Sequence, residues 1–240
     1  MSRRETSTLA RTIAAGVGAG AVGGALVGRS MLLRWGTTTH ERDERLPGDS
    51  LIPHPHLVAT RAITIDRPAS GVWPWIAQLG QGRGGFYSYD RLENLVGCDI
   101  HSADRVVAAW QDVRLGDTVR LAPEVGLAVA IADAPNALVL RGGIPMGSAP
   151  PPYDFSWAFV VRDQPDGGSR LVVRERYRYL SAWARLLVEP VGVVSFVMTH
   201  GMLRGIRARA LTVDAPTTAD ISLTGVMAST RARESAPTPG

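Results

Sequence analysis

The sequence has only one cysteine, Cys98, among its 240 residues. A single cysteine excludes an internal disulfide framework and a metal site built from clustered cysteines, and it leaves the cellular compartment open. The CxxH spacing of Cys98 and His101 is weak by itself, and a nucleophilic thiol needs an activating partner, so we expect Cys98 to be inert. His54 and His56 lack a third ligand and predict a solvated loop. We therefore expect no metal and no cofactor.

Lysine and blocks of like charge are also missing. All the basic residues are arginines, the net charge is +4, and no run of five like charges occurs. Surfaces that bind nucleic acids concentrate basic residues, so this scattered distribution predicts no nucleic-acid partner. With 45% hydrophobic residues, a chain of this length is expected to form one globular domain with tails.

Charged residues are absent from the run TIAAGVGAGAVGGALVG at 12–28, in which Gly16, Gly20, Gly24 and Gly28 repeat every fourth residue. This spacing places small residues on one helix face, as in membrane helices that approach one another closely. In water the same glycines would disfavour a helix. The run therefore predicts a membrane anchor that is able to self-associate, a flexible leader or an uncleaved signal-like segment, and it is short for a full span.

Composition divides the chain into four segments. Residues 1–36 form the hydrophobic segment with the possible anchor, and the polar, proline-containing residues 37–56 are interpreted as a linker. Residues 57–212 form the domain, and the Thr-, Ala-, Ser- and Pro-rich residues 213–240 are expected to be a disordered tail. The protein is expected to be membrane-associated with a soluble domain, and otherwise cytoplasmic.

Hydrophobic periodicity predicts the order of the elements in the domain. Alternation at Val58 to Asp66 predicts a strand, and Pro68 opens a helix that Pro74 bends. A short helix at 90–96 follows, and from Gly116 the period changes to two. The predicted later strands are 118–121, 127–132, 137–141, 154–162 and 170–180, with 163–168 as a hairpin loop.

The final predicted helix, 190–211, is the stretch around which the domain is organised. Its first part, 191–203, carries no charge and is apolar nearly all round, which predicts burial on more than one side. It is too short to span a bilayer and fits a core helix better. Because glycine is costly in a helix interior, Gly201 and Gly205 indicate close approach by a sheet or a ligand.

A formal GxGxxG pattern occurs at 80–85. Dinucleotide-binding patterns of this kind follow a strand and open a helix within a βαβ unit. Here the pattern follows a helix, so it predicts a hinge between two helices and no dinucleotide site.

Three segments carry a resemblance to a known family: ATRAITIDRPASGVWPWIAQLG at 59–80, WAFVVRDQPDGGSRLVVRERYR at 157–178, and the helix from Val193. They resemble the opening strand and helix, the late hairpin and the last helix of the START/Bet v 1-like (SRPBCC, polyketide cyclase/dehydrase-type) superfamily. The segment GRGGFYSYDRLEN is similar to an uncharacterised actinobacterial-type branch, which implies no chemistry.

The resemblance implies an α+β helix-grip fold. A curved antiparallel sheet of about six to seven strands would wrap around the long C-terminal helix, with two short helices after the first strand and a cavity between sheet and helix. The implied function is binding of a small hydrophobic or amphipathic ligand, such as a lipid, polyketide or isoprenoid-like molecule. A cyclase or dehydratase is the alternative, and a protein-interaction module is a third class. The superfamily has no universal catalytic residue.

Strand alternation selects the residues that face the cavity. In the segment 173–179, the three arginines share one face and are expected to meet water, so Glu175 points inward. An inward carboxylate must be paired or hydrogen-bonded. It is either a polar anchor or general base, or a structural carboxylate satisfied by a tyrosine, by His200 or by Arg61.

The catalytic candidates are Glu175 and His200, with Tyr177 or Tyr179 as hydrogen-bond donors. The expected ligand-binding residues are Trp73, Phe86, Tyr89, Trp157, Phe159, Glu175, Tyr177, Tyr179, Met198, Gly201 and Met202.

Overall fold

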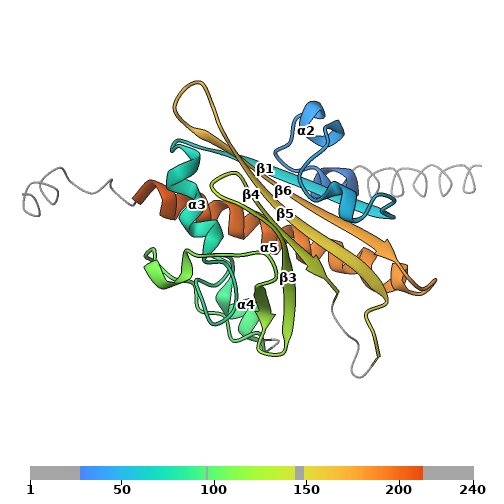
Figure 1. Ribbon diagram of the computed structural model, residues 1–240. Helices are drawn as coiled ribbons and strands as arrows, with labels where there is room; N and C mark the ends of the chain where they lie inside the picture. The colour runs from blue at the N-terminus through green and yellow to red at the C-terminus, as the bar shows by residue number, and fades with distance from the viewer. Residues whose placement is uncertain (1–27, 96, 144–148, 213–240) are drawn as a thin grey trace, which may run out of the picture.

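The computed structural model describes residues 28–95, 97–143 and 149–212 (Figure 1). The predicted anchor at 12–28, except for its last residue, and the predicted tail at 213–240 lie outside these ranges.

Six antiparallel strands form one open, curved sheet in the order β1-β6-β5-β4-β3-β2. Neighbouring strands are joined by hairpins except at β1, whose β-branched sequence pairs along its whole length with the last strand, β6. The strands are β1 (Leu57–Ile65), β2 (Thr118–Ala122), β3 (Val125–Asp133), β4 (Ala137–Gly142), β5 (Tyr153–Asp163) and β6 (Ser169–Tyr179). All six lie within three residues of the predicted strands.

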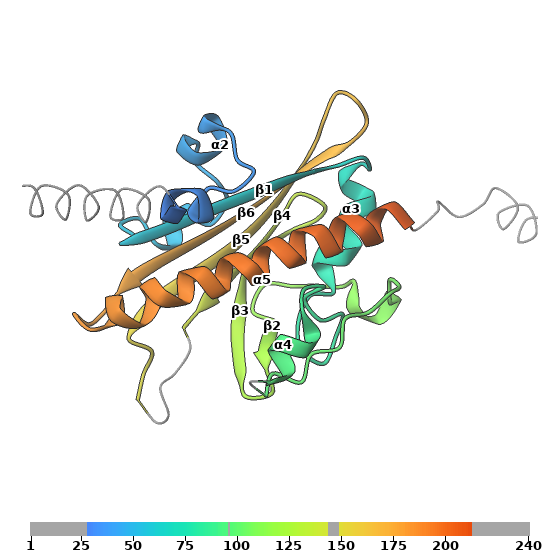
Figure 2. The ribbon, with the colours of Figure 1, turned by 180° about the vertical axis from the view of Figure 1, so that it is seen from behind.

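One long helix, α5 (Ala184–Thr212), crosses one face of this sheet, and Figure 2 shows it running diagonally in front of the strands. Two short helices, α3 (Ala69–Ala77) and α4 (Asp90–Leu95), follow the first strand, with a 3₁₀ turn, η2 (Ala108–Trp110), beyond them. The chain therefore has the predicted α+β helix-grip architecture.

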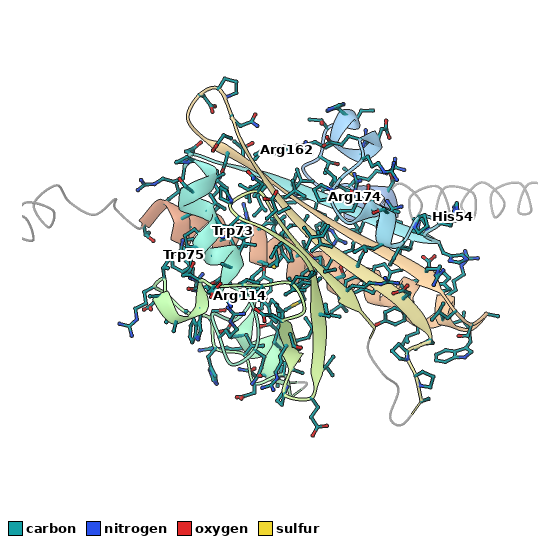
Figure 3. The ribbon with its side chains drawn as sticks, viewed as in Figure 1. His54, Trp73, Trp75, Arg114, Arg162 and Arg174 are labelled. Carbon is teal, nitrogen blue, oxygen red and sulfur yellow. The ribbon has the colours of Figure 1, made fainter. Side chains whose placement is uncertain are left out.

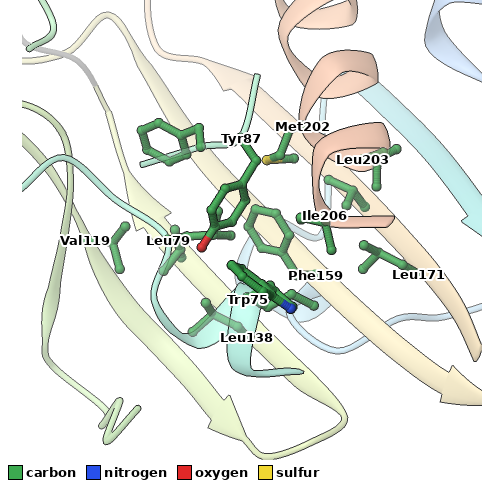
Figure 4. Packing of buried hydrophobic residues seen from close by; sticks show 14 of the residues in the cluster. Trp75, Leu79, Tyr87, Val119, Leu138, Phe159, Leu171, Met202, Leu203 and Ile206 are labelled. Carbon is green, nitrogen blue, oxygen red and sulfur yellow. The ribbon is translucent and has the colours of Figure 1, made fainter. Parts of the chain in front are cut away.

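The main core lies between the sheet, α3 and the C-terminal half of α5. Trp75 of α3, Phe159 of β5 and Leu203 and Ile206 of α5 are fully buried and pack together (Figure 4). Burying a large apolar side chain contributes about 1.5–3 kcal/mol, so this cluster fixes α5 against the sheet. Trp73 and Phe159 belong to this core.

The N-terminal half of α5 differs from its prediction. The helix begins at Ala184 and carries Pro190 within it. Val193 and Val194 are 54% and 59% exposed, so the prediction that this half is buried on more than one side is wrong. The sheet and the cavity cover one side of the helix here, and no other described element covers its outward side.

By length and composition, α5 is the one helix among the described residues that could cross a membrane. A core helix of a soluble domain passes the same test, and α5 contacts α3, β1 and β6.

Residues 37–56 are not the linker that their polar composition suggested. They form α2 (Thr39–Asp43), with a capping box between Thr38 and Glu41, and the 3₁₀ turn η1 (Asp49–Leu51). Leu46 and Ile52 are buried. This segment covers the face of the sheet opposite α5, so it belongs structurally to the domain.

The segment also changes the environment of the arginines on β6. Arg174 is 2% exposed, and its guanidinium donates to Asp49 Oδ2 at 2.7 Å and to three backbone carbonyls of the segment, those of Glu41, Arg42 and Glu44. Figure 3 places Arg174 beneath α2. Arg176 pairs with the same carboxylate at 3.1 Å. The expectation that the arginines meet water is therefore wrong for Arg174 and Arg176, because residues 37–56 shield them, whereas Arg178 is exposed as expected.

The glycines of α5 are explained by the segment that precedes α4. A Cβ at Gly205 would overlap the backbone oxygen of Tyr87, and one at Gly201 would lie 2.8 Å from the ring of Tyr89. The close approach at Gly201 and Gly205 is therefore made by residues 87–89 and not by the sheet. The glycine-rich residues 80–85 form a closed turn, in which Gly80 and Gly85 exchange backbone hydrogen bonds at 3.0 Å.

Candidate functional site

A cavity of about 600 Å³ lies beside the N-terminal half of α5. The sheet, the segment containing α4, and α5 each form part of its wall. The sheet contributes Leu121, Tyr153, Phe155, Trp157, Glu175 and Tyr177; the segment near α4 contributes Phe86, Ser88, Leu92, Glu93 and Cys98; α5 contributes Leu187, Val188, Val193, Val194, Ser195, Val197, Met198, Thr199 and Met202.

Aromatic rings line the sheet side of the cavity. Phe155 and Trp157 alternate along β5, and Tyr177 on β6 pairs directly with Phe155. Their ring centroids lie 4.7 Å apart for Phe155 and Tyr177, and 6.4 Å apart for Phe155 and Trp157. Phe86 closes this wall from the other side, 5.9 Å from Trp157. Strand alternation therefore builds a continuous apolar surface, as the sequence predicted.

The larger of two polar groups in these walls is centred on the buried carboxylate of Glu175, and the other is the pair Ser88 and Glu93. Arg61 Nη1 donates to Glu175 Oε1 at 2.7 Å, and Tyr177 donates its hydroxyl to Oε2 at 3.0 Å. Ser195 and Thr199, one turn apart on α5, donate at 2.7 Å and 3.0 Å. A carboxylate has about four acceptor positions, so the protein itself supplies a partner for each.

This cluster decides between the two interpretations of Glu175. A general base needs a free acceptor position near the reacting group, and the four donors already occupy this carboxylate. The hydrogen bonds of Glu175 to Arg61 and Tyr177 are those expected of a structural carboxylate, and Glu175 also lines the cavity. Burial, together with the neighbouring Glu175, raises the pKa of Tyr177 well above its usual value of 10, so this hydroxyl stays protonated.

His200 lies away from the cavity. Its ring contacts Trp35 at 4.5 Å and Phe196 at 5.6 Å between centroids, on a different side of α5 from the cavity-lining Met198 and Met202. Burial and the charge of Arg204 lower its pKa. Among the described residues, His200 is not a partner of Glu175, so the predicted acid–base pair has no geometric basis.

Six of the eleven predicted ligand-binding residues line the cavity: Phe86, Trp157, Glu175, Tyr177, Met198 and Met202. The other five lie elsewhere. Trp73 and Phe159 are in the main core, Tyr89 covers Gly201, and the ring of Tyr179 stacks on His56 at 4.9 Å. Alternation placed Tyr179 inward, but it lies at the end of β6, beyond the cavity.

The sequence interpretation missed Ser195 and Thr199. Two hydroxyl residues at i and i+4 in an otherwise apolar helix share one face, and that spacing was the available signal. It also missed Glu93, whose Oε1 accepts from Ser88 at 2.7 Å and whose Oε2 is buried without a partner. Burial, together with the charge of Asp90, raises the pKa of Glu93.

Cys98 also borders the cavity. Burial and the neighbouring carboxylate of Glu93 raise the pKa of its thiol. A raised pKa lowers the thiolate fraction, which disfavours nucleophilic chemistry. Within the described ranges, no group of three or more His, Cys, Asp or Glu side chains could hold a metal ion.

Comparisons with known proteins add no assignment of activity. No protein family and no curated protein matches the sequence. Among solved structures, the chain is similar to Ms6760 from Mycobacterium smegmatis, with 19% sequence identity, a TM-score of 0.38, and coverage of 67% of this chain and 93% of that chain.

Two further structures are similar at the same level. CalU16 from Micromonospora echinospora has 13% identity and a TM-score of 0.32, with 64% of this chain and 83% of that chain covered. DynU16, a protein in the dynemicin biosynthetic locus, has 12% identity and a TM-score of 0.35, with 62% and 47% covered. Strand order and the position of α5 define the class directly: an α+β helix-grip domain with an internal apolar cavity.

Proposed function

We propose that this protein binds a small, neutral, apolar or amphipathic molecule, such as a lipid, polyketide or isoprenoid-like compound, and that it is a member of the START/Bet v 1-like superfamily. The observation that carries the proposal is the cavity of about 600 Å³ with mostly apolar and aromatic walls. Ligand sites in proteins have volumes of about 300–1,000 Å³ and combine apolar walls with a few polar groups.

The charge balance of the polar cluster favours a neutral ligand. Arg61 and Glu175 form a buried ion pair at 2.7 Å, and each side chain is at most 5% exposed. A charged ligand group placed beside them would be buried without a counterion, which is costly. A ligand hydroxyl group can instead donate a hydrogen bond to the oxygen of Ser195 or Tyr177 at the cavity wall, because both residues already donate their own hydroxyl hydrogen to Glu175.

The test is saturable binding of a neutral fluorescent probe, N-phenyl-1-naphthylamine, to the full-length protein. We expect one site per chain. Met198→Trp places an indole in the cavity and should weaken binding about tenfold or more. Ala208→Trp adds the same ring at an exposed position of α5 outside the cavity and should leave the affinity unchanged. Binding that does not saturate, or that both variants weaken equally, contradicts the proposal.

The alternative of a cyclase or dehydratase lacks its predicted acid–base pair. Glu175 has its acceptor positions filled, and His200 lies outside the cavity. The observation that favours such chemistry is Glu93, which lines the cavity, has a raised pKa and keeps Oε2 without a hydrogen-bond partner. No second acid or base is paired with it among the described cavity residues, so binding is the better-supported function.

A further inference from the structure

Exposed apolar side chains occur on two elements that form the cavity wall, α4 and the N-terminal half of α5, and in the turn before α5. A single exposed leucine is ordinary, but a contiguous apolar patch on a soluble domain marks an interaction surface. Leu95 and Leu186 are 81% and 79% exposed, and Trp183 is half-exposed. We call this group the apolar rim: Leu92, Leu95, Trp183, Leu186, Val193, Val194 and Val197. Four of its members, Leu92, Val193, Val194 and Val197, also line the cavity, so the rim and the opening are continuous.

The outward side of α5 is most apolar in its N-terminal half, although the exposed Ala208 and Leu211 also lie on this side further along the helix. Leu186, Val193 and Val197 stand at i, i+7 and i+11, which places them on one outward stripe of the helix. The next residue on this stripe, at i+18, is the exposed Arg204. A helix that faces water carries polar residues on its outward side. The N-terminal half of α5 therefore presents a surface suited to a non-aqueous environment, and Figure 2 shows this half on the same side of the sheet as α4.

Basic residues flank the rim. Arg91 is exposed on α4 beside Leu92, and the side chain of Arg185, next to Leu186, is 74% exposed and lies 3.7 Å from the carboxylate of Glu189. Exposed arginines beside an apolar patch attract anionic lipid headgroups. Trp183 adds an amphipathic ring of the kind that is enriched at membrane–water interfaces.

The N-terminal segment enters at the same end of α5. Residues 28–33 are helical, and Arg29 pairs with Glu189 at 2.6 Å, one turn from Leu186. Gly28, the last residue of the run 12–28 that the sequence predicts to be either a membrane anchor or a leader, is therefore next to a residue that contacts this end of α5. An anchor there would bring the rim to the bilayer surface.

We propose that the apolar rim docks on the surface of a bilayer that contains anionic lipids, with the cavity opening against the membrane. An apolar ligand then passes between bilayer and cavity without crossing water, which removes the cost of hydrating it. A second copy of the chain fits the same face less well. A two-fold interface brings a surface against itself, so the arginines that flank the rim would meet those of the other copy. The docking step does not depend on the proposed ligand-binding function. The loading step rests on that function.

Docking is tested with full-length protein on vesicles of phosphatidylcholine and phosphatidylserine in which the acyl chains are brominated. Bromine quenches nearby tryptophan fluorescence, and the difference between the wild type and Trp183→Phe isolates the signal of Trp183. We expect Trp183 to be quenched. Leu186→Glu should abolish this Trp183-specific quenching, whereas Leu115→Glu, at an equally exposed leucine in the loop before β2, should preserve it. Far-UV circular dichroism checks that each variant is folded.

Loading is tested by transfer of the neutral probe from the same vesicles into the protein. Leu186 does not line the cavity, so Leu186→Glu should slow transfer about tenfold while the affinity for the probe in solution stays unchanged.

Absence of Trp183 quenching in the wild type overturns the docking proposal, as does equal quenching on vesicles of pure phosphatidylcholine. A dimer that Leu186→Glu dissociates, together with no quenching, assigns the face to a second copy. If Trp183 is quenched but no probe binds the cavity, docking stands and the proposed ligand-binding function fails.

Discussion

Replacing Arg61 by methionine should destabilise the domain strongly. The side chains of Arg61 and Glu175 are 1% and 5% exposed, and no solvent can replace the lost guanidinium. Arg61→Met leaves the carboxylate with three neutral donors, those of Tyr177, Ser195 and Thr199. Removing one partner of a buried ion pair costs about 3–5 kcal/mol, because the remaining charge stays buried without compensation.

The companion change Glu175→Gln separates the charge from the packing. The double variant Arg61→Met/Glu175→Gln no longer carries the unpaired charge, so it should lose less stability than Arg61→Met alone. The coupling energy between the two changes should be about 2 kcal/mol or more. Urea unfolding followed by circular dichroism gives the free energy of unfolding and its dependence on denaturant. Arg114→Met is the matched control, since Arg114 pairs with Asp112 at the exposed surface (Figure 3) and its loss should not be measurable.

Two results would refute this reasoning. One is a loss below about 1 kcal/mol for Arg61→Met, which would mean that water or another donor reaches the carboxylate. The other is a double variant whose loss equals the sum of the two single losses, because the two residues would then act independently.

Two further predictions concern α4 and the segment before it. Burial raises the pKa of Glu93, so its contribution to stability is present below the unfolded pKa of about 4.3 and is lost as pH rises through the folded value. Urea midpoints measured from about pH 4 to pH 8 should show this loss of stability in the wild type and not in Glu93→Gln. The control variant Glu124→Gln, at an exposed position, should behave as the wild type. Parallel pH profiles for all three proteins would contradict the prediction. Gly205→Ala should lower the free energy of unfolding by about 1–3 kcal/mol in the same assay, because the new methyl group overlaps the backbone of Tyr87. A substitution at Gly192, which has open space around it, should be tolerated far better. Equal losses of stability at the two glycines would contradict the close approach.

Local patterns determined most of the fold. The period-two runs gave each strand within three residues, and the turn sequence at 163–168 gave the hairpin between β5 and β6. Alternation also placed Glu175 and Tyr177 inside, because successive side chains on a strand must point to opposite faces. These features depend on neighbours in the sequence, so a single chain carries them without any tertiary information.

Tertiary structure decided which residues meet. Arg61 and Glu175 are 114 residues apart in the sequence and become diagonal neighbours only because Ala59 pairs with Glu175 in the β1–β6 register. The rotation of α5 then places Ser195 and Thr199 at the carboxylate and His200 outside the cavity.

Local sequence patterns also did not determine whether a whole face of a strand or helix is buried or exposed. Arg174 on β6 has the alternation of a solvent-facing residue, yet it is buried because residues 37–56, more than 100 positions earlier, fold over it. The apolar sequence of α5 predicted full burial, but Val193 and Val194 stay exposed because no described element reaches the outward side of that half of the helix. Periodicity reports which side chains share a face, and only the packing of distant segments decides whether that face meets the core, a cavity or the surface.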